Sequence, residues 1–209
     1  MQLSRIVYAV VFLTAALGAG AKAAEVESEL PSGLFNTVHC LKYAGLTAPL
    51  SGLVVGVKPD PTIEHPMVVC VARRPGQTVV LDAGFIDEAY GKTQGVTDFT
   101  SLAARLGDIG VKPEEVNLVT IGHLHWDHAG GTSVFPNARF VLQRRELEYA
   151  AIDVPGNPFV RNGFRPDEVF DALRLKWDGR LDLVDGDAEG WGGNRGCNQG
   201  APSLSSIDW

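Results

Sequence analysis

Three of the five histidines in this 209-residue chain lie within the stretch Gly122 to Gly130, which reads G-H-L-H-W-D-H-A-G. An aspartate, Asp127, stands between the second and third of them. Neutral imidazoles and carboxylates that converge on one point are what a divalent metal ion needs. Histidines can also be ordinary surface or core residues. That interpretation suits a lone histidine better than a cluster of three. The residue types and their spacing therefore predict a metal site.

The spacing also predicts where the side chains point. In an extended chain alternate residues face the same side, so His123, His125 and Asp127 share one face. If a helix begins near Asp127, its first turn brings His128 back toward the same pocket. We therefore expect two neighbouring metals, one bound by His123 and His125 and the other by Asp127 and His128.

Two histidines and one aspartate outside the motif are also candidates for a role at the site. His39 lies inside an apolar run and His65 precedes a proline, so we interpret both as structural. Asp82 follows the apolar run of residues 78–81, at the end of an expected strand. The residues alone indicate a turn former there and leave any other role of Asp82 open.

Apolar, β-branched runs predict the strands that would position these residues. Three antiparallel strands come first, and strand and helix patterns alternate afterwards, which favours an α/β fold with helices covering a mixed sheet. Residues 44–66, with several prolines and glycines, are predicted to be a long loop or flap. The expected strands are 34–43, 67–72, 78–81, 116–121 and 139–142, and the expected helices are 98–110, capped by Asp98 or Thr100, a helix near Asp127, 144–151 and 166–173.

The stretch H-L-H-W-D-H-A-G-G, placed after the strand V-N-L-V-T-I, resembles the metal-binding motif of the metallo-β-lactamase superfamily. Within that superfamily the wider sequence is similar to the N-acyl-homoserine lactonase branch. The resemblance covers roughly residues 34–189. The supporting stretches are L-D-A-G at 81–84, L-G-D-I-G-V-K-P-E-E-V at 106–116, V-L-Q-R-R-E-L-E-Y-A-A at 141–151 and L-V-D-G-D-A-E at 183–189.

The resemblance implies an αββα sandwich, of which this chain holds the N-terminal αβ half plus part of the second. It further implies two Zn²⁺ ions and the ring-opening of a lactone by a metal-bound hydroxide. His123 and His125 would bind the first zinc, and Asp127 and His128 the second. Asp127 would also be catalytic, because it handles the proton that passes to the leaving group. Asp82 would orient a ligand without touching the metal.

The chain departs from the superfamily pattern after the motif. The superfamily completes its site with a third histidine in a G-H-x-x-G-H-like segment, a bridging aspartate and a last histidine, yet no histidine follows His128. We therefore expect the domain of residues 34–189 to be incomplete. Residues 190–209, rich in Gly, Ser and Asn, are interpreted as an irregular foreign tail, with a frameshift or premature end of the coding sequence as the simplest cause.

Two alternative functions stay open beside the lactonase. One is a catalytically inactive remnant that lacks the later metal ligands, so whether the chain is an active enzyme is left undecided. The other is a different hydrolase of the same superfamily, acting on a β-lactam, a thioester or a phosphodiester.

The N-terminus has the pattern of a cleaved export signal over residues 1–23. Arg5 supplies a positive charge, residues 6–17 are apolar, and Ala21-Lys22-Ala23 is an A-x-A cleavage site. The apolar run is shorter than the roughly twenty residues that a membrane-spanning helix needs. We expect a periplasmic or secreted protein, with residues 24–33 as a linker and no membrane association after cleavage.

Charge and cysteine content limit the partners. Removing residues 1–23 takes away two basic residues and no acid, which leaves 16 basic and 25 acidic residues and a formal charge of −9. That balance argues against a nucleic-acid partner. The partner that the family resemblance implies is a small-molecule lactone or ester. Export would permit a disulfide between Cys40 and Cys70, but their apolar surroundings favour two buried thiols.

Overall fold

The computed structural model describes residues 24–25, 35–52, 54, 56–57 and 61–186. The expected signal segment, most of the expected linker and the interpreted tail of residues 190–209 lie outside the described residues. Within the described part, no helix has both the length and the apolar character to cross a membrane.

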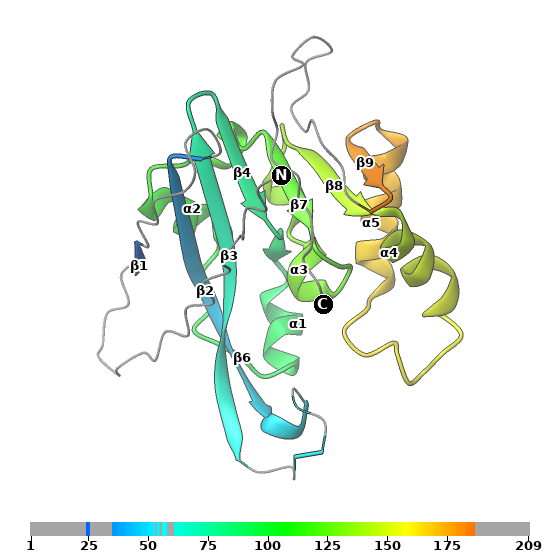
Figure 1. Cartoon of the computed structure of the whole chain (residues 1–209). Helices are drawn as coiled ribbons and strands as arrows, with labels where there is room; N and C mark the ends of the chain where they lie inside the picture. The colour runs from blue at the N-terminus through cyan, green and yellow to red at the C-terminus, as the bar shows by residue number, and fades with distance from the viewer. Residues whose placement is uncertain (1–23, 26–34, 53, 55, 58–60, 187–209) are drawn as a thin grey trace, which may run out of the picture.

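The described strands form one mixed sheet with the order β1-β2-β3-β4-β7-β8-β9, and β6 pairs with β2 (Figure 1). Neighbours from β1 to β4 are antiparallel, and the pairs β4/β7, β7/β8 and β8/β9 are parallel. The predicted α/β class and mixed sheet are confirmed. The strands are β1 (Ala24–Glu25), β2 (Thr37–Pro49), β3 (Thr62–Arg74), β4 (Gln77–Leu81), β5 (Gly84–Phe85), β6 (Val96–Thr97), β7 (Leu118–Ile121), β8 (Arg139–Gln143) and β9 (Leu181–Val184).

The segment 44–66 is not the loop or flap that its prolines predicted. Strands β2 and β3 continue through it as a long antiparallel hairpin, paired from Thr37↔Arg73 to Pro49↔Thr62, and only residues 50–61 connect them. Proline removes a backbone donor, and it is tolerated where a strand lacks a partner on one side. Pro66 meets that condition, because among the described strands β4 pairs only with the Cys70–Arg74 end of β3.

Short helices connect the strands, and Figure 1 shows α4 and α5 beside β8 and β9. Ser101 caps α2, because its side chain accepts a hydrogen bond from the Ala104 amide. The predicted cap, Asp98 or Thr100, is therefore wrong, and the observed cap is the residue that follows Thr100. The expected helix 144–151 is α4 followed by a π-helical turn. The helices are α1 (Glu88–Thr93), α2 (Leu102–Asp108), α3 (Trp126–Ala129), α4 (Arg144–Glu148), the π turn η4 (Tyr149–Asp153) and α5 (Pro166–Trp177), with 3₁₀ turns η1 (Leu50–Gly52), η2 (Pro113–Glu115) and η3 (Thr132–Val134).

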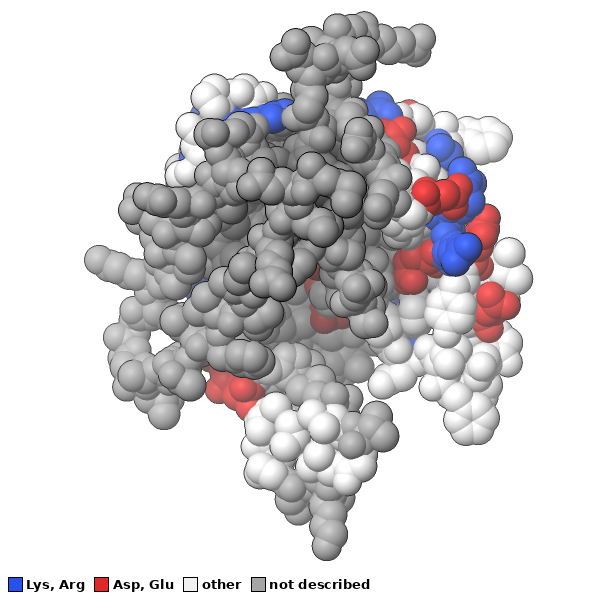
Figure 2. All heavy atoms as spheres, in the orientation of Figure 1, with Lys and Arg blue, Asp and Glu red and all other residues white. Residues whose placement is uncertain are grey.

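The apolar residues of these elements form one continuous core between the sheet and its helices. Phe85, Phe135 and Phe140 are among its largest fully buried side chains. Basic and acidic side chains alternate on the molecular face around β9 and α5, where Arg139 pairs with Asp182 and Arg174 with Asp171 (Figure 2). The core packs the helices against the parallel half of the sheet, which carries the predicted metal-binding motif.

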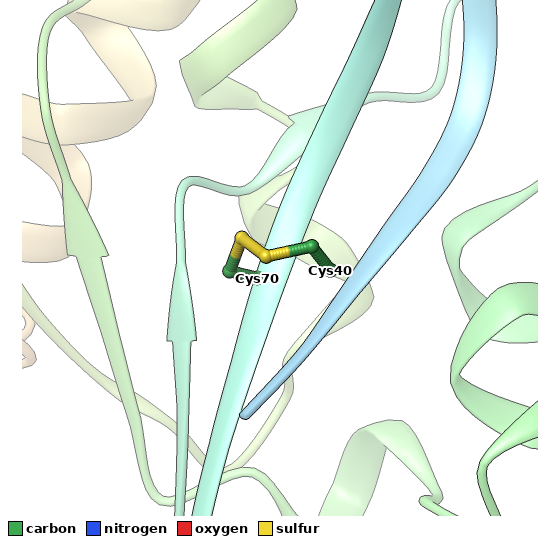
Figure 3. The surroundings of a disulfide bond; sticks show 2 residues. All are labelled: Cys40 and Cys70. Atoms are coloured by element: carbon green, nitrogen blue, oxygen red, sulfur yellow. A yellow bond between two sulfur atoms is a disulfide. The ribbon is translucent and has the colours of Figure 1, made fainter. Parts of the chain in front are cut away.

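A disulfide joins Cys40 of β2 to Cys70 of β3, so the favoured interpretation as two buried thiols is wrong (Figure 3). The two cysteines are directly opposed across the antiparallel ladder, with their Cα atoms 4.1 Å apart. Cys40 is exposed and Cys70 half-buried, because both lie on the outer side of the hairpin instead of in the core. Apolar neighbours in sequence did not reveal which face of the strand the two residues share.

Candidate metal centre

The candidate site lies where two neighbouring parallel strands end. Strand β4 ends at Leu81 and β7 at Ile121, and Leu81 pairs with Thr120 in the register between them. Asp82 follows the first strand and Gly122 the second. Since the carboxyl ends of parallel strands meet at one edge of a sheet, residues 40 positions apart in sequence become neighbours there.

The three motif histidines gather at this edge. The ring centroids of His123 and His125 are 4.3 Å apart, and those of His123 and His128 are 4.1 Å apart. Leu124 and Trp126 point the other way and are 0% and 6% exposed. The alternation predicted for the extended stretch is therefore present, and helix α3 begins at Trp126, next to the predicted start.

Asp82 joins the two strand ends and holds one histidine. Its backbone amide donates to the Thr120 carbonyl at 2.8 Å, and its Oδ1 accepts from the Gly122 amide at 2.8 Å. Its Oδ2 lies 2.8 Å from Nδ1 of His128. An ionised carboxylate only accepts hydrogen bonds, so Nδ1 of His128 carries a proton and Nε2 presents the lone pair of the neutral ring. The structure thus places Asp82 as the partner of His128 and not merely as a turn residue.

The surroundings give the three imidazoles different proton affinities. Burial, together with the nearby His128 and His125 rings, lowers the pKa of His123 to about 4. Burial also lowers the pKa of His125. Burial alone would lower the pKa of His128, but the hydrogen bond that His128 donates to Asp82 and the charge of Asp127 outweigh it and raise that pKa. His123 and His125 are therefore neutral near pH 7, the form in which an imidazole binds metal.

Asp127 faces the same region from the first turn of α3. Its Oδ2 lies 3.5 Å from Nε2 of His128, and its side chain is 23% exposed. The buried Tyr43 of β2 donates from its hydroxyl to the Asp127 backbone carbonyl at 2.9 Å. This bond fixes the backbone of α3, so the carboxylate stays beside His128 and remains open to solvent.

The residue types present suit a divalent metal, since imidazole and carboxylate together suit zinc. The His123 ring lies 4.3 Å from that of His125 and 4.1 Å from that of His128, and Asp127 lies beside His128. No group of three or more His, Cys, Asp or Glu side chains in the described part of the chain is arranged to hold a metal ion. The division into two metal pairs stays a prediction, and each predicted pair has fewer than the three protein ligands of a usual catalytic zinc site.

Glycines let the motif pass close to the strand ends. The Ala83 amide donates to the His128 carbonyl at 2.7 Å, and β5 bridges to Ala129 and Gly130. A Cβ at Gly131 would meet the Ala83 carbonyl oxygen, and one at Gly130 would meet the Trp126 carbonyl oxygen. Only residues without a side chain allow this approach.

Sequence reasoning missed three residues that support the motif from elsewhere. Glu146 accepts a hydrogen bond from the Leu124 amide at 2.8 Å, and Tyr43 bonds to Asp127 as described above. The ring of Phe164 packs against His125 with centroids 4.4 Å apart. Glu146 lies in a stretch that supported the family resemblance, but nothing local in the sequence pointed to its contact. His39 and His65, interpreted as structural, lie in β2 and β3.

Comparison with known proteins identifies relatives of the sequence. The sequence matches the metallo-beta-lactamase superfamily over residues 64–205. It is 36% identical over 83 residues to the N-acyl homoserine lactonase AttM of Azorhizobium caulinodans, covering 38% of this chain and 32% of that protein. It is 35% identical over 128 residues to AttM of Rhizobium radiobacter, covering 54% of this chain and 46% of that protein. The chain thus spans less than half the length of these relatives.

A solved structure agrees on the fold. The structure of an N-acyl homoserine lactone hydrolase, with the product N-hexanoyl-L-homoserine at its catalytic metal centre, superposes with a TM-score of 0.58. The sequence identity is 18%, and the match covers 75% of this chain and 62% of that one. At this identity the likeness shows a shared fold and nothing of the substrate.

Proposed function

The chain belongs to the metallo-beta-lactamase superfamily, and from that membership and its site we propose that it derives from a metal-dependent hydrolase that opens lactone rings of the N-acyl-homoserine type. One observation carries the proposal. His123, His125, His128 and Asp127 meet at the ends of β4 and β7, with Asp82 bonded to His128. The lactonase relatives supply the substrate class.

In this proposal His123 and His125 hold one zinc ion, and Asp127 and His128 hold the other. A bound divalent metal supplies two things to ester hydrolysis: a water whose pKa falls from 15.7 to about 7, and polarisation of the carbonyl under attack. Burial keeps His123 and His125 unprotonated for binding. Nδ1 of His128 is paired with Asp82, and Nε2 would be the nitrogen available to bind a metal.

Asp127 is the catalytic residue of the proposal. Ring opening breaks the acyl C–O bond, and the departing alkoxide oxygen takes up a proton. The Asp127 carboxylate is partly exposed beside the ligands, so it can accept a proton from the attacking water and return it to that oxygen. Asp82 orients His128 through Nδ1, a positioning role that fixes the ring tautomer.

Metal content and lactone turnover of the purified chain test the proposal. Zinc is measured by mass spectrometry after dialysis, and hydrolysis of N-hexanoyl-homoserine lactone by chromatography of the opened acid. We expect bound zinc and turnover in the parent chain, and a loss of turnover of about 100-fold or more in Asp127→Asn. His39→Gln in β2 is the control. Equal turnover in the parent and in Asp127→Asn would refute the role of Asp127.

The second candidate is that the chain has no catalytic activity. It is favoured by the absence of any three-ligand group among the described residues. Such a chain would hold less than one zinc per molecule and open no lactone. Assay of a β-lactam, a thioester and a phosphodiester beside the lactone separates it from the other hydrolases of the superfamily, because only the inactive chain fails on all four.

Export to an oxidising compartment is a further part of the proposal. The Cys40–Cys70 disulfide supports it, since disulfides persist mainly outside the cytosol. The substrate partner would then be a small lactone met in the periplasm or medium, with no nucleic acid or membrane involved. Expression of the full coding sequence followed by cell fractionation tests this, and retention of the uncleaved chain in the cytosol would contradict it.

A further inference from the structure

The backbone of the metal-binding motif receives its support from two carboxylates that flank it. Strand β7 ends at Ile121, where its last pairing is with Leu142 of β8. The next amides need acceptors from outside the strand ladder. Asp82, after β4, accepts from Gly122, and Glu146, in α4 after β8, accepts from Leu124. The two strands beside β7 are therefore each followed by a carboxylate, and these two carboxylates accept hydrogen bonds from backbone amides just after β7 ends.

The bond from Leu124 to Glu146 joins a buried residue to a half-buried carboxylate. Leu124 is 0% exposed, and its amide donates to Glu146 Oε1 at 2.8 Å. A buried amide without an acceptor is strongly disfavoured, and a hydrogen bond to an ionised carboxylate is about twice as strong as one to a neutral oxygen. The two partners are 22 residues apart, so the bond ties the motif to a separate helix.

The Leu124 amide lies between the two histidines of the first predicted metal pair. The Leu124 amide belongs to the peptide between His123 and Leu124, and His125 follows directly. The two histidine rings lie 4.3 Å apart, and a net change in the backbone dihedrals at this peptide would alter their relative direction. On the proposed function, on which this step rests, the same two rings form the first metal pair.

We propose that Glu146 is a positioning residue of the metal centre, which fixes the Leu124 peptide and thereby holds His123 and His125 on one side. Glu146 touches neither metal nor substrate and acts through the backbone. When a residue that orients a metal ligand without binding the metal is removed, the metal affinity typically falls by about 10- to 100-fold.

Three variants of the full chain test this positioning role. Glu146→Ala removes the acceptor, Glu146→Gln keeps a neutral one, and Glu148→Ala changes an exposed carboxylate of the same helix. Two properties are read by NMR in the metal-free chain: hydrogen exchange of the Leu124 amide, and the ring signals of His123 and His125. The affinity for Zn²⁺ alone is then measured by competition with a chelating dye.

In Glu146→Ala we expect Leu124 exchange to accelerate by about tenfold or more, both ring signals to shift, and zinc affinity to fall about 10- to 100-fold. Glu146→Gln should lie between it and the parent, and Glu148→Ala within about twofold of the parent. If Glu146→Ala does not fold, the Glu146→Gln variant decides by the same readouts.

Unchanged exchange and ring signals would overturn the proposal, and so would a loss of thermal stability without any shift of the histidine signals. If the parent chain binds no zinc or opens no lactone, the proposed function fails. The exchange and ring signals still decide the role of Glu146 in that case, because both are measured without metal.

Discussion

Asp82 has a left-handed backbone conformation, with φ of 66°, at the point where β4 gives way to the site. Few residues other than glycine adopt that conformation, and aspartate is among those that do. The turn directs the carboxylate at both the Gly122 amide and Nδ1 of His128. A residue type common in turns therefore also determines the tautomer of a histidine 46 positions away.

Replacing Asp82 by Asn should lower the pKa of His128 in the metal-free chain, because the amide keeps the shape but loses the charge. The pKa of His128 in the folded chain lies above its ordinary value. The stabilisation from the pair is therefore complete below about pH 6.5 and is lost as pH rises through the folded pKa. NMR titration and urea unfolding between pH 5.5 and 8 measure both effects.

Asp98→Asn is the matched control, because Asp98 also has a positive φ, of 52°. It should leave the His128 titration unchanged. An Asp82→Asn chain whose His128 titrates as in the parent would contradict the assigned contact.

Glu168 of α5 predicts a second loss of stability with rising pH, which begins at a lower pH than the one from His128. It is 5% exposed, and its Oε2 has no hydrogen-bond partner among the described residues. Burial raises its pKa despite the Arg165 guanidinium 3.9 Å away. The folded chain thus binds a proton that the unfolded chain has released, so stability falls as pH rises from about 4.3 through the folded pKa.

We expect Glu168→Gln to be more stable than the parent at pH 7 and equal to it at pH 4, as measured by thermal unfolding at both values. The exposed Glu148→Gln provides the comparison and should change little at either pH. A Glu168→Gln chain that unfolds earlier than the parent at pH 7 would show that the charged form is stabilising.

At the scale of elements, the site is fixed by short segments packed on one another rather than by long helices. Helix α3 has four residues, and its position comes from β5, from the Tyr43 hydroxyl and from the loop before α5. That loop supplies the Gly163 carbonyl, which accepts from the Trp126 amide at 3.0 Å. Trp126 in turn packs edge-on against Phe85 and Tyr90.

The contact between α3 and the strand ends predicts a cost for any side chain at Gly131. In Gly131→Ala the new Cβ would meet the Ala83 carbonyl oxygen, so the backbone has to shift. We expect a loss of about 1–3 kcal/mol in the free energy of unfolding, measured by urea titration, together with weaker zinc binding.

Gly107→Ala in α2 serves as the control, because its Cβ would meet no atom within 4 Å. Alanine there should stabilise the helix by about 0.5–1 kcal/mol. Equal effects of the two substitutions would mean that the Gly131 backbone does not approach Ala83 closely.

For the whole molecule, the described residues form one sheet with its helices and one core. The long β2–β3 hairpin extends beyond the part of the sheet paired with β4, and the Cys40–Cys70 disulfide lies beside the Cys70–Leu81 pair where β4 joins β3 (Figure 3). The cross-link closes a loop with a sequence separation of 30 residues, which includes the whole far end of the hairpin.

Removing the disulfide by a paired Cys40→Ala and Cys70→Ala substitution should lower the free energy of unfolding by about 3–4 kcal/mol in the chain-entropy account. Urea unfolding measures the loss. The reducing agent TCEP should destabilise the parent and leave the double variant unchanged. Since the chain has three cysteines, the native parent should take up at most one iodoacetamide adduct without reduction, and three adducts would exclude the disulfide.

The sequence alone determined the class of the fold and the residue types of the motif. The order H-x-H-x-D-H predicts metal ligands, and alternation along an extended stretch predicts that His123 and His125 share a face. Apolar runs likewise predicted β4, β7 and β8, because buried parallel strands are apolar throughout. These features depend on residues close together in the chain.

Only the tertiary structure decided which distant residues support the motif. Tyr43 is 84 residues from Asp127, and Glu146 is 22 residues from Leu124. Such pairings follow from strand register and crossover, which local patterns do not encode. The same cause explains two of the errors. Pro66 lies in β3 where no described strand pairs with it on one side, and Cys40 faces Cys70 because of the register between β2 and β3.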